Sequence, residues 1–248
     1  MSEEIIIGKN ALNHAIKSGR TINKVYLSQQ LNQTTENEIR RALSKRKVPI
    51  QKIPRKKLDE LTSGKHQGIV AFVAEYTYHS LQEVLQRAQK KDELPFLIIL
   101  DQLEDPHNLG AILRTADAAG AHGVIIPKHR AVGLTETVAK ASAGAIEHVP
   151  VVRVTNIAQT IERLKEENIW IVGTDERESD DYRTLDGDIA IAIVIGNEGR
   201  GISRIVKEKC DWFVHIPMQG EVPSLNASVA ASIIMFEIFR KRNPLGEN

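Results

Sequence analysis

The polar side chains best placed for chemistry follow apolar runs in the last quarter of the sequence. The segment Gly-Asn-Glu-Gly at 196–199 ends the apolar run Ile189–Ile195, and a base, Arg200, comes directly after it. A second short run, Phe213–Met218, leads into a polar loop and a helix that starts at Asn226. Apolar runs of this kind are typical of strands buried on both faces of a parallel sheet. Polar strand ends beside a helix start predict a ligand site at the carboxyl edge of that sheet.

The glycine turn at 196–201 does not have the spacing of a dinucleotide-binding loop. Its sequence, GNEGRG, is not G-x-G-x-x-G, and it lacks the Lys-Ser/Thr pair of a phosphate-binding loop. A dinucleotide oxidoreductase is therefore disfavoured. Glycines here leave backbone N–H and C=O groups open to a ligand, although a tight turn alone also explains them.

A third polar segment, Asp105 to Gly110, precedes a helix that contains Arg114. Asn108 has the residue type of a helix N-cap, and Asn226 can cap the last helix in the same way. Glu198 also suits a solvent-facing turn, and an Arg among apolar helix residues is more often paired or surface-directed than catalytic. Each residue alone has a structural explanation, so only their joint spacing favours a functional site.

Composition excludes several classes of protein. The 248 residues are 42% hydrophobic, which is ample for real cores. A single cysteine, Cys210, excludes a disulfide framework and a cysteine-built metal site. The sequence has no basic-then-apolar leader and no apolar run of transmembrane length. The expectation is a soluble cytoplasmic protein.

The charge is distributed unevenly along the chain. Residues 1–75 contain 14 Lys and Arg against 7 Asp and Glu, a net charge of +7, whereas residues 76–248 contain 19 against 25, a net charge of −6. A basic part of this kind indicates contact with a polyanion, although a solvated basic face has the same composition. The residues that carry most of this charge are Lys45, Arg46, Lys47, Lys52, Arg55, Lys56 and Lys57.

Periodicity divides the chain into two α/β parts joined by a short linker at 75–80. In the first part, 1–74, we expect strands at 5–7, 24–27, 48–53 and 68–74 and helices at 10–18, 35–47 and 56–61. In the second, 81–248, a helix at 81–91 precedes repeated strand-helix units, which indicate a parallel sheet with helices on both sides. Its expected strands are 97–100, 123–126, 149–154, 169–173, 189–195 and 213–218, and its helices are 108–119, 135–143, 157–167 and 226–242.

Three segments of the second part together resemble the signature motifs of the SpoU/TrmH ribose 2′-O-methyltransferases, in the SPOUT superfamily. They are DPHNLG at 105–110 followed by Arg114, GNEG at 196–199, and IPM at 216–218 with SLNAS at 224–228. The resemblance covers nearly the whole chain and is strongest to RlmB-type enzymes, which methylate a guanosine of large-subunit ribosomal RNA. It implies a small L30e-like RNA-binding domain followed by a SPOUT-type parallel sheet with a C-terminal deep trefoil knot.

The resemblance also implies S-adenosylmethionine as the cofactor, no metal, and a homodimer formed through the C-terminal domain. The residues that it places around the cofactor are Gly173, Thr174, Gly196, Asn197, Glu198, Gly199, Ile216, Met218, Ser224, Leu225 and Asn226. Those that it implies for catalysis are Asn108, Arg114, Glu198 and Asn226. In the family the counterpart of Arg114 is the group proposed to activate the ribose hydroxyl. Since a guanidinium rarely gives up its proton, it also suits stabilising the developing alkoxide or positioning a phosphate.

The basic residues Lys45, Arg46, Lys47, Arg55, Lys56 and Lys57 are the predicted RNA contacts. His66 and Gln67 match a short family motif near the nucleic acid, and a turn whose Gly68 has positive φ explains them equally well.

The resulting hypothesis is a methyltransferase acting on the ribose 2′-hydroxyl of a guanosine in 23S ribosomal RNA, with ribosomal RNA and a second copy of the chain as partners. Two alternatives stay open. One is a transfer-RNA guanosine 2′-O-methyltransferase of the same family. The other is a noncatalytic RNA-binding factor in ribosome assembly, which a cofactor-binding assay would distinguish from an enzyme.

Overall fold

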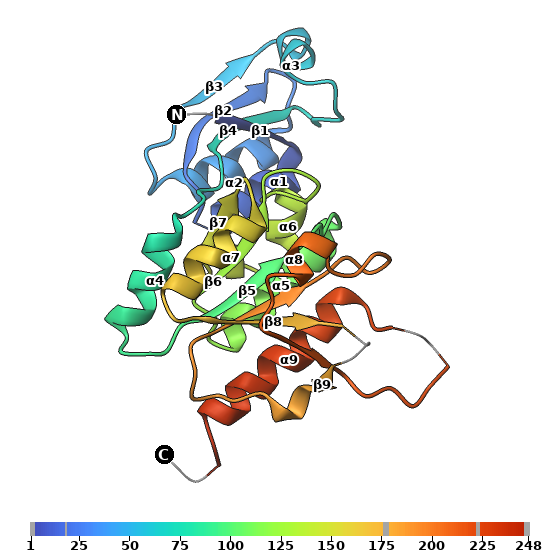
Figure 1. Ribbon diagram of the computed structural model, residues 1–248. Coiled ribbons are helices and arrows are strands. Elements are labelled where there is room, and N and C mark those ends of the chain that lie inside the picture. The colour runs from blue at the N-terminus through green and yellow to red at the C-terminus, as the bar shows by residue number, and fades with distance from the viewer. Residues whose placement is uncertain (1–2, 18, 176–178, 222–223, 246–248) are drawn as a thin grey trace. The chain divides into compact units, whose positions relative to one another are not determined.

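The computed structural model describes residues 3–17, 19–175, 179–221 and 224–245. The chain forms two compact units, Met1–Tyr76 and Thr77–Asn248 (Figure 1). Ser18, which ends a predicted helix, and residues 176–178 and 222–223, in two predicted loops, lie outside the described residues.

The first unit is a four-stranded sheet with the strand order β1-β4-β2-β3. The central strand β4 is antiparallel to both β1 and β2, whereas β2 and β3 are parallel. Its elements are β1 (Glu3–Ile7), α1 (Gly8–Lys17), β2 (Ile22–Ser28), α2 (Gln33–Leu43), β3 (Ile50–Ile53), α3 (Arg55–Leu61) and β4 (Ile69–Ala74). The predicted alternation of strands and helices is confirmed. Helix α2, however, ends at Leu43 rather than Lys47, because turns at 44–47 follow it.

The second unit is built on a parallel sheet with the strand order β7-β6-β5-β10-β8-β11-β9. Strand β10 lies between β5 and β8 and pairs with both in parallel. The strands are β5 (Phe96–Leu100), β6 (Gly123–Pro127), β7 (Val151–Val154), β8 (Trp170–Thr174), β9 (Asp180–Asp181), β10 (Ile191–Ile195) and β11 (Trp212–His215). The predicted parallel sheet is confirmed, and the trefoil knot stays a prediction.

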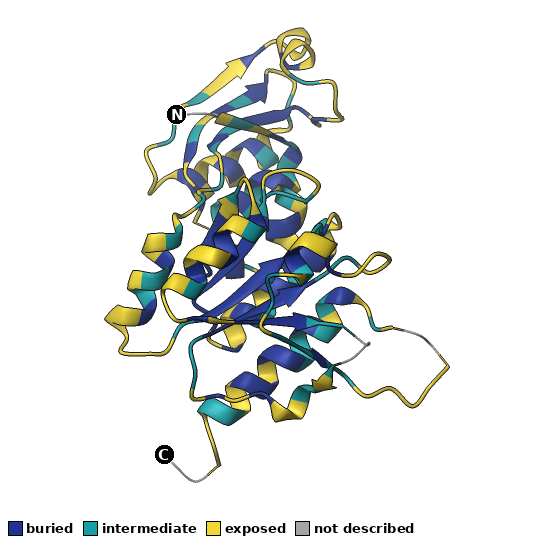
Figure 2. Cartoon of the chain, viewed as in Figure 1, coloured by how far each residue is buried: buried dark blue, intermediate teal, exposed yellow. Residues whose placement is uncertain are grey.

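Helices lie on both faces of this sheet. They are α4 (Leu81–Lys90), α5 (Pro106–Ala118), α6 (Glu136–Ala141), α7 (Ile157–Glu166), α8 (Arg204–Lys207) and α9 (Ala227–Arg242), with short 3-10 turns at Ala145–Glu147 and Tyr182–Thr184. Alternate strand residues pack with α4, α7 and α8 on one face. On the other face α5 packs against α6 and α9. The central strands β5 and β10 are accordingly buried along their whole length, whereas the edge strands β7 and β9 have exposed residues (Figure 2).

The structure differs from the local predictions for the second unit at four points. Asn108 does not cap α5: Asp105 does, its carboxylate accepting from the His107 N–H, and Asn108 lies inside the first turn. The predicted strand 213–218 ends at His215, so Ile216 and Met218 follow it as loop residues. Helix α8 and the short strand β9 were not expected at all.

Helix α9 has a small exposed apolar surface. Ile238 is fully buried in the core rather than exposed, and Ile233 is half-buried. Val229, Phe236 and Phe239 keep exposed fractions of 47%, 46% and 38%. The exposed apolar surface of α9 thus consists of these three side chains.

The close approach of α5 to α6 gives a stability prediction. A Cβ added at Gly110 would lie 2.3 Å from the Ala141 Cβ and 2.9 Å from the Val138 carbonyl oxygen. Gly110→Ala should therefore lower the free energy of unfolding by about 1–3 kcal/mol, measured by urea denaturation. Gly220→Ala, where no described atom lies within 4 Å of the new Cβ, is the control. Equal stability of the two variants would contradict this packing.

Candidate active site

A single carboxylate oxygen joins three segments at the carboxyl edge of the sheet. Glu198 Oε1 accepts hydrogen bonds from Asn108 Nδ2 at 2.9 Å, from Asn226 Nδ2 at 2.6 Å and from the Ala227 N–H at 3.2 Å. Asn226 Nδ2 also lies 3.0 Å from Asn108 Oδ1. Asn108 is 90 residues away from Glu198 in the chain. The structure therefore brings together three of the four predicted catalytic residues.

Asn226 has two roles in this cluster. Its Oδ1 accepts hydrogen bonds from Ser228 N at 3.0 Å and Val229 N at 3.3 Å, which caps helix α9. Its Nδ2 donates to Glu198 and Asn108. The capping role considered from the sequence is confirmed, and the same side chain lies in the candidate site.

The glycine turn that carries Glu198 is held by its own backbone. Asn197 and Gly201 exchange N–H···O=C hydrogen bonds of 3.1 and 2.8 Å, and Asn197 Nδ2 donates to the Gln102 carbonyl at 3.0 Å. A Cβ at Gly196 would lie 2.3 Å from the Gly201 carbonyl carbon. Gly196 is therefore required for the turn itself.

Arg114, the fourth predicted catalytic residue, does not reach this cluster. It is exposed, and its side chain makes no hydrogen bond or ion pair to any residue that the structure describes. It lies six positions after Asn108 on α5, which places it about 120° around the helix. Its exposed stripe also contains His107 and Ala118. Within one chain, Arg114 thus points away from Glu198.

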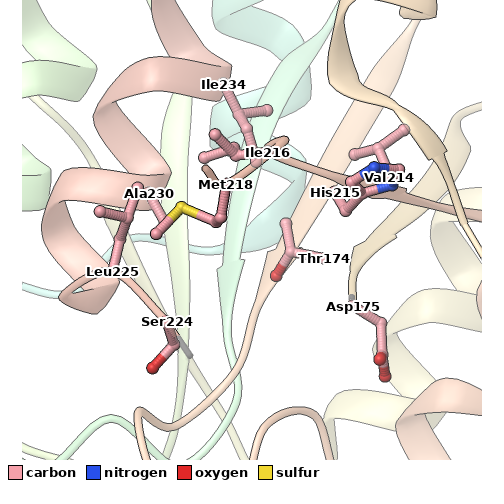
Figure 3. A pocket seen from close by; sticks show the side chains of 10 residues that line it. All are labelled: Thr174, Asp175, Val214, His215, Ile216, Met218, Ser224, Leu225, Ala230 and Ile234. Carbon is pink, nitrogen blue, oxygen red and sulfur yellow. The ribbon is translucent and has the colours of Figure 1, made fainter. Parts of the chain in front are cut away.

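A hollow beside the cluster collects several predicted cofactor residues (Figure 3). It has a volume of about 130 Å³ and lies between the ends of β8 and β11 and the first turns of α9. Met218, Leu225 and Ala230 lie side by side on its apolar wall, while Thr174 and Ser224 bring hydroxyls to it. The Thr174 hydroxyl donates to the Val194 carbonyl at 3.0 Å. An apolar wall with a few polar groups is the usual character of a small-molecule site.

Sequence reasoning found only part of this hollow. The predicted residues that line it are Thr174, Ile216, Met218, Ser224 and Leu225, and the ones that it missed are Asp175, Val214, His215, Ala230 and Ile234. The i, i+4 spacing of Ala230 and Ile234 on α9 is the signal that could have found two of them.

Gly173, Gly196, Asn197, Glu198, Gly199 and Asn226 do not line the hollow. Gly173 has a packing role, because a Cβ there would lie 2.4 Å from the Phe213 ring.

Two of the residues predicted to contact RNA form hydrogen bonds within the first unit. His66 is 3% exposed, and its Nδ1 accepts from the Gly68 N–H at 2.9 Å while Nε2 pairs with Asp59 at 2.8 Å. Arg46 donates to the Ile16 carbonyl at 2.5 Å, at the end of α1. These contacts explain both residues without RNA.

The other predicted contacts in the first unit have exposed side chains: Lys45, Lys47, Arg55, Lys56, Lys57 and Gln67. Gln67 has a φ of +50°, so the positive φ expected at this turn occurs at both Gln67 and Gly68. Lys52, part of the basic cluster, is paired with Glu36 at 2.6 Å.

Two further observations concern metal-binding and thiol groups among the described residues. Among them, no group of three or more His, Cys, Asp or Glu could hold a metal ion. Burial raises the pKa of the Cys210 thiol to about 12, so it does not supply a thiolate nucleophile at neutral pH. In the described part of the chain, no helix has the length and apolarity to cross a bilayer.

Comparison with known families agrees with this geometry. Residues 95–236 match the SpoU rRNA Methylase family, and residues 5–79 match the domain described as RNA 2′-O ribose methyltransferase substrate binding. The chain therefore belongs to the SpoU/TrmH family of RNA methyltransferases. The predicted family, the α/β fold with an N-terminal substrate-binding domain, and the enzyme class of S-adenosylmethionine-dependent RNA methyltransferase are confirmed.

Individual relatives span nearly the whole chain. YacO of Bacillus subtilis (strain 168), placed by its name in the TrmH family of tRNA/rRNA methyltransferases, is 54% identical over 98% of this chain and 98% of its own. The SpoU methyltransferase AviRb from Streptomyces viridochromogenes, solved in complex with AdoMet, is 27% identical, with a TM-score of 0.73 over 97% of this chain and 90% of its own. The A. aeolicus TrmH/SpoU tRNA modifying enzyme is 28% identical, with a TM-score of 0.56 over 64% and 84%.

The three hydrogen bonds to Glu198 give the second prediction. Glu198→Ala leaves the amide donors of Asn108 and Asn226 without their acceptor, so methyl transfer should fall by about 10²-fold or more. Glu198→Gln keeps one acceptor oxygen and should retain more activity than Glu198→Ala. The assay is transfer of a radiolabelled methyl group to RNA, with the exposed Glu166→Ala on α7 as the control. Near-normal turnover in Glu198→Ala would show that the cluster only supports the fold.

Proposed function

We propose that this protein transfers the methyl group of S-adenosylmethionine to the ribose 2′-hydroxyl of a guanosine in 23S ribosomal RNA. The observation that carries the proposal is the hydrogen-bonded cluster of Glu198, Asn108 and Asn226 next to the hollow beneath α9. The match of the first unit to a ribose methyltransferase substrate-binding domain supports RNA as the substrate. An enzyme acting on this RNA would work in the cytoplasm.

The residues of the hollow fit the cofactor. Its apolar wall of Ile216, Met218 and Leu225 suits a flat purine, and Thr174 and Ser224 suit the polar groups of a ribose or an amino acid. The loops that follow β10 and β11 add backbone N–H and C=O groups. S-adenosylmethionine supplies, when bound, a methyl group already activated by a positively charged sulfur.

Most of the rate should therefore come from positioning the hydroxyl. Glu198 and the two asparagines form a fixed set of donors and acceptors that can orient the ribose. Arg114 is suited to stabilise the alkoxide that develops as the hydroxyl attacks, because its guanidinium stays charged. Arg114 lies about 120° around α5 from Asn108 and points away from Glu198, so we infer that it acts in the site of a second copy.

A homodimer formed through α9 would allow this exchange. Val229, Phe236 and Phe239 are exposed apolar side chains on that helix, and the Phe236 and Phe239 rings are 5.7 Å apart. Burying them against a second copy would remove apolar surface from water. The proposed dimer therefore has both an apolar surface to bury and a catalytic group to share.

We favour ribosomal RNA over transfer RNA as the substrate because the first unit resembles the N-terminal domain of RlmB-type enzymes. To test this choice, ribose methylation is mapped in ribosomal and transfer RNA after deletion of the gene. We expect one guanosine of 23S ribosomal RNA to lose its 2′-O-methyl group and to regain it on complementation. Loss confined to transfer RNA would replace the proposed substrate, and no loss in either RNA would contradict the function.

Arg114→Ala should lower methyl transfer by about 10²-fold with melting temperature and cofactor affinity near wild type, because the side chain is exposed and leaves no cavity. Calorimetry with S-adenosylmethionine and thermal unfolding measure the last two quantities. A mixture of Arg114→Ala and Glu198→Ala subunits should recover part of the activity in heterodimers. Absence of recovery would place both groups in one chain, and unfolding of Arg114→Ala would make it a structural residue.

A further inference from the structure

A groove follows the carboxyl edge of the sheet where β5, β6 and β7 end, next to α7 and α8. It has a volume of about 230 Å³, and its lining includes Asp101, Gln102, Pro127, Arg130 and Ile205. The groove shares a wall with the catalytic turn. The Gln102 carbonyl accepts the hydrogen bond from Asn197 Nδ2 at 3.0 Å, one residue before Glu198. The groove therefore borders the turn that carries Glu198, yet none of the residues predicted for the site lines it.

The rim of this groove is locally basic, although the second unit has an excess of acids. His129 and Arg130 line the groove and are exposed, and the exposed Lys128 directly precedes them in the chain. Their side chains make no hydrogen bond or ion pair within the described part of the chain. The carboxylate of Asp101, at the base of the groove, is 4% exposed, and its Oδ2 accepts from the Ser203 N–H at 2.7 Å. The charge offered to a ligand at the rim is therefore positive.

The backbone below these basic side chains is fastened at several points. Lys128 N donates to the Val154 carbonyl at 2.7 Å, Val132 N to the Leu103 carbonyl at 2.9 Å, and Leu134 N to the Tyr78 hydroxyl at 2.8 Å. The loop that carries His129 and Arg130 is thus anchored on both sides of these residues.

Two residues that line the groove have left-handed backbone conformations. Gln102 has a φ of +61° and Arg130 a φ of +55°, and neither one follows a helix, where such conformations are routine. Each costs on the order of 1 kcal/mol or more, and this kind of strain gathers at functional sites.

Apolar side chains also line the groove, beside its basic residues. Ile205, on α8, is 61% exposed, and it lines the groove together with Pro127. Apolar side chains beside a cationic rim suit one ligand in particular, a nucleotide, whose flat base contacts the wall while its phosphate meets the charge.

We propose that this groove binds an unpaired nucleotide of the RNA next to the methylated one, with its phosphate at Arg130 and its base against Pro127 and Ile205. The proposal rests on the proposed function for the identity of the substrate. On this proposal the second unit, which is acidic overall, contacts RNA directly, beside the turn that carries Glu198.

The first test compares Arg130→Ala with Arg163→Ala in the full-length enzyme. Arg163 is an exposed arginine of α7 that does not line the groove. With ribosomal RNA from the deletion strain, Arg130→Ala should raise KM for RNA about tenfold and lower the salt dependence of RNA binding by about one phosphate contact. Its kcat at saturating RNA and its affinity for S-adenosylmethionine should match Arg163→Ala. Equal KM values for the two variants would overturn the proposal.

The second test does not depend on turnover. The same RNA, carrying 4-thiouridine, is photo-crosslinked to the full-length protein, and the attached peptides are identified by mass spectrometry. Crosslinks at 127–130 or at Ile205 support the groove, and their loss in Ile205→Ser confirms the wall. Crosslinks confined to other segments reject it. If the wild type methylates no RNA, the proposed function fails, and these crosslinks still decide whether RNA occupies the groove.

Discussion

The carboxylate of Glu198 is the group on which the site depends, because one of its oxygens accepts three N–H donors from two other segments. Hydrogen bonds to a charged group contribute about 1.5–3 kcal/mol each, and the donors would be left without an acceptor if the carboxylate moved. The first turn of α5 and the start of α9 must therefore meet the turn after β10. The order of the sheet, with β10 between β5 and β8, is what allows this meeting.

Groups in this site serve the fold and the site at once. Asn226 caps α9 with its oxygen and reaches Asn108 and Glu198 with its nitrogen. Asn197 closes the glycine turn and ties it to the Gln102 carbonyl. A structural role for such a residue therefore does not argue against a functional role. An amide side chain can accept a hydrogen bond from the backbone with its oxygen and donate one within the site with its nitrogen.

The sequence predicts the repeating architecture well and individual contacts poorly. The apolar runs of β5 and β10 are five residues long and are followed by polar turns, which is the pattern of strands buried in a parallel sheet. Helix α8, with four residues, and β9, with two, are too short to show a period. Asn108 and Glu198 were grouped only through the family resemblance, because no local pattern relates residues 90 positions apart.

Contacts between side chains and backbone groups also could not be predicted from the sequence. Arg46 resembles any other basic residue of its cluster, yet its partners are the carbonyls of Ile16 and Arg20. His66 likewise resembles a surface residue until the fold buries it between Asp59 and Gly68. Every residue carries a carbonyl and an N–H, so nothing in a sequence marks the ones that a distant side chain will use.

The strand order has a kinetic consequence. Strand β10 pairs with β5, which lies far back in the chain, so the central ladder closes only after a long loop has been ordered. Local helices such as α5 and α7 form on the microsecond scale, whereas long-range parallel pairing is slow. A refolding chain should thus recover its helical signal first and its active site last. The interval between the two is the time the chain needs to bring β5 and β10 together.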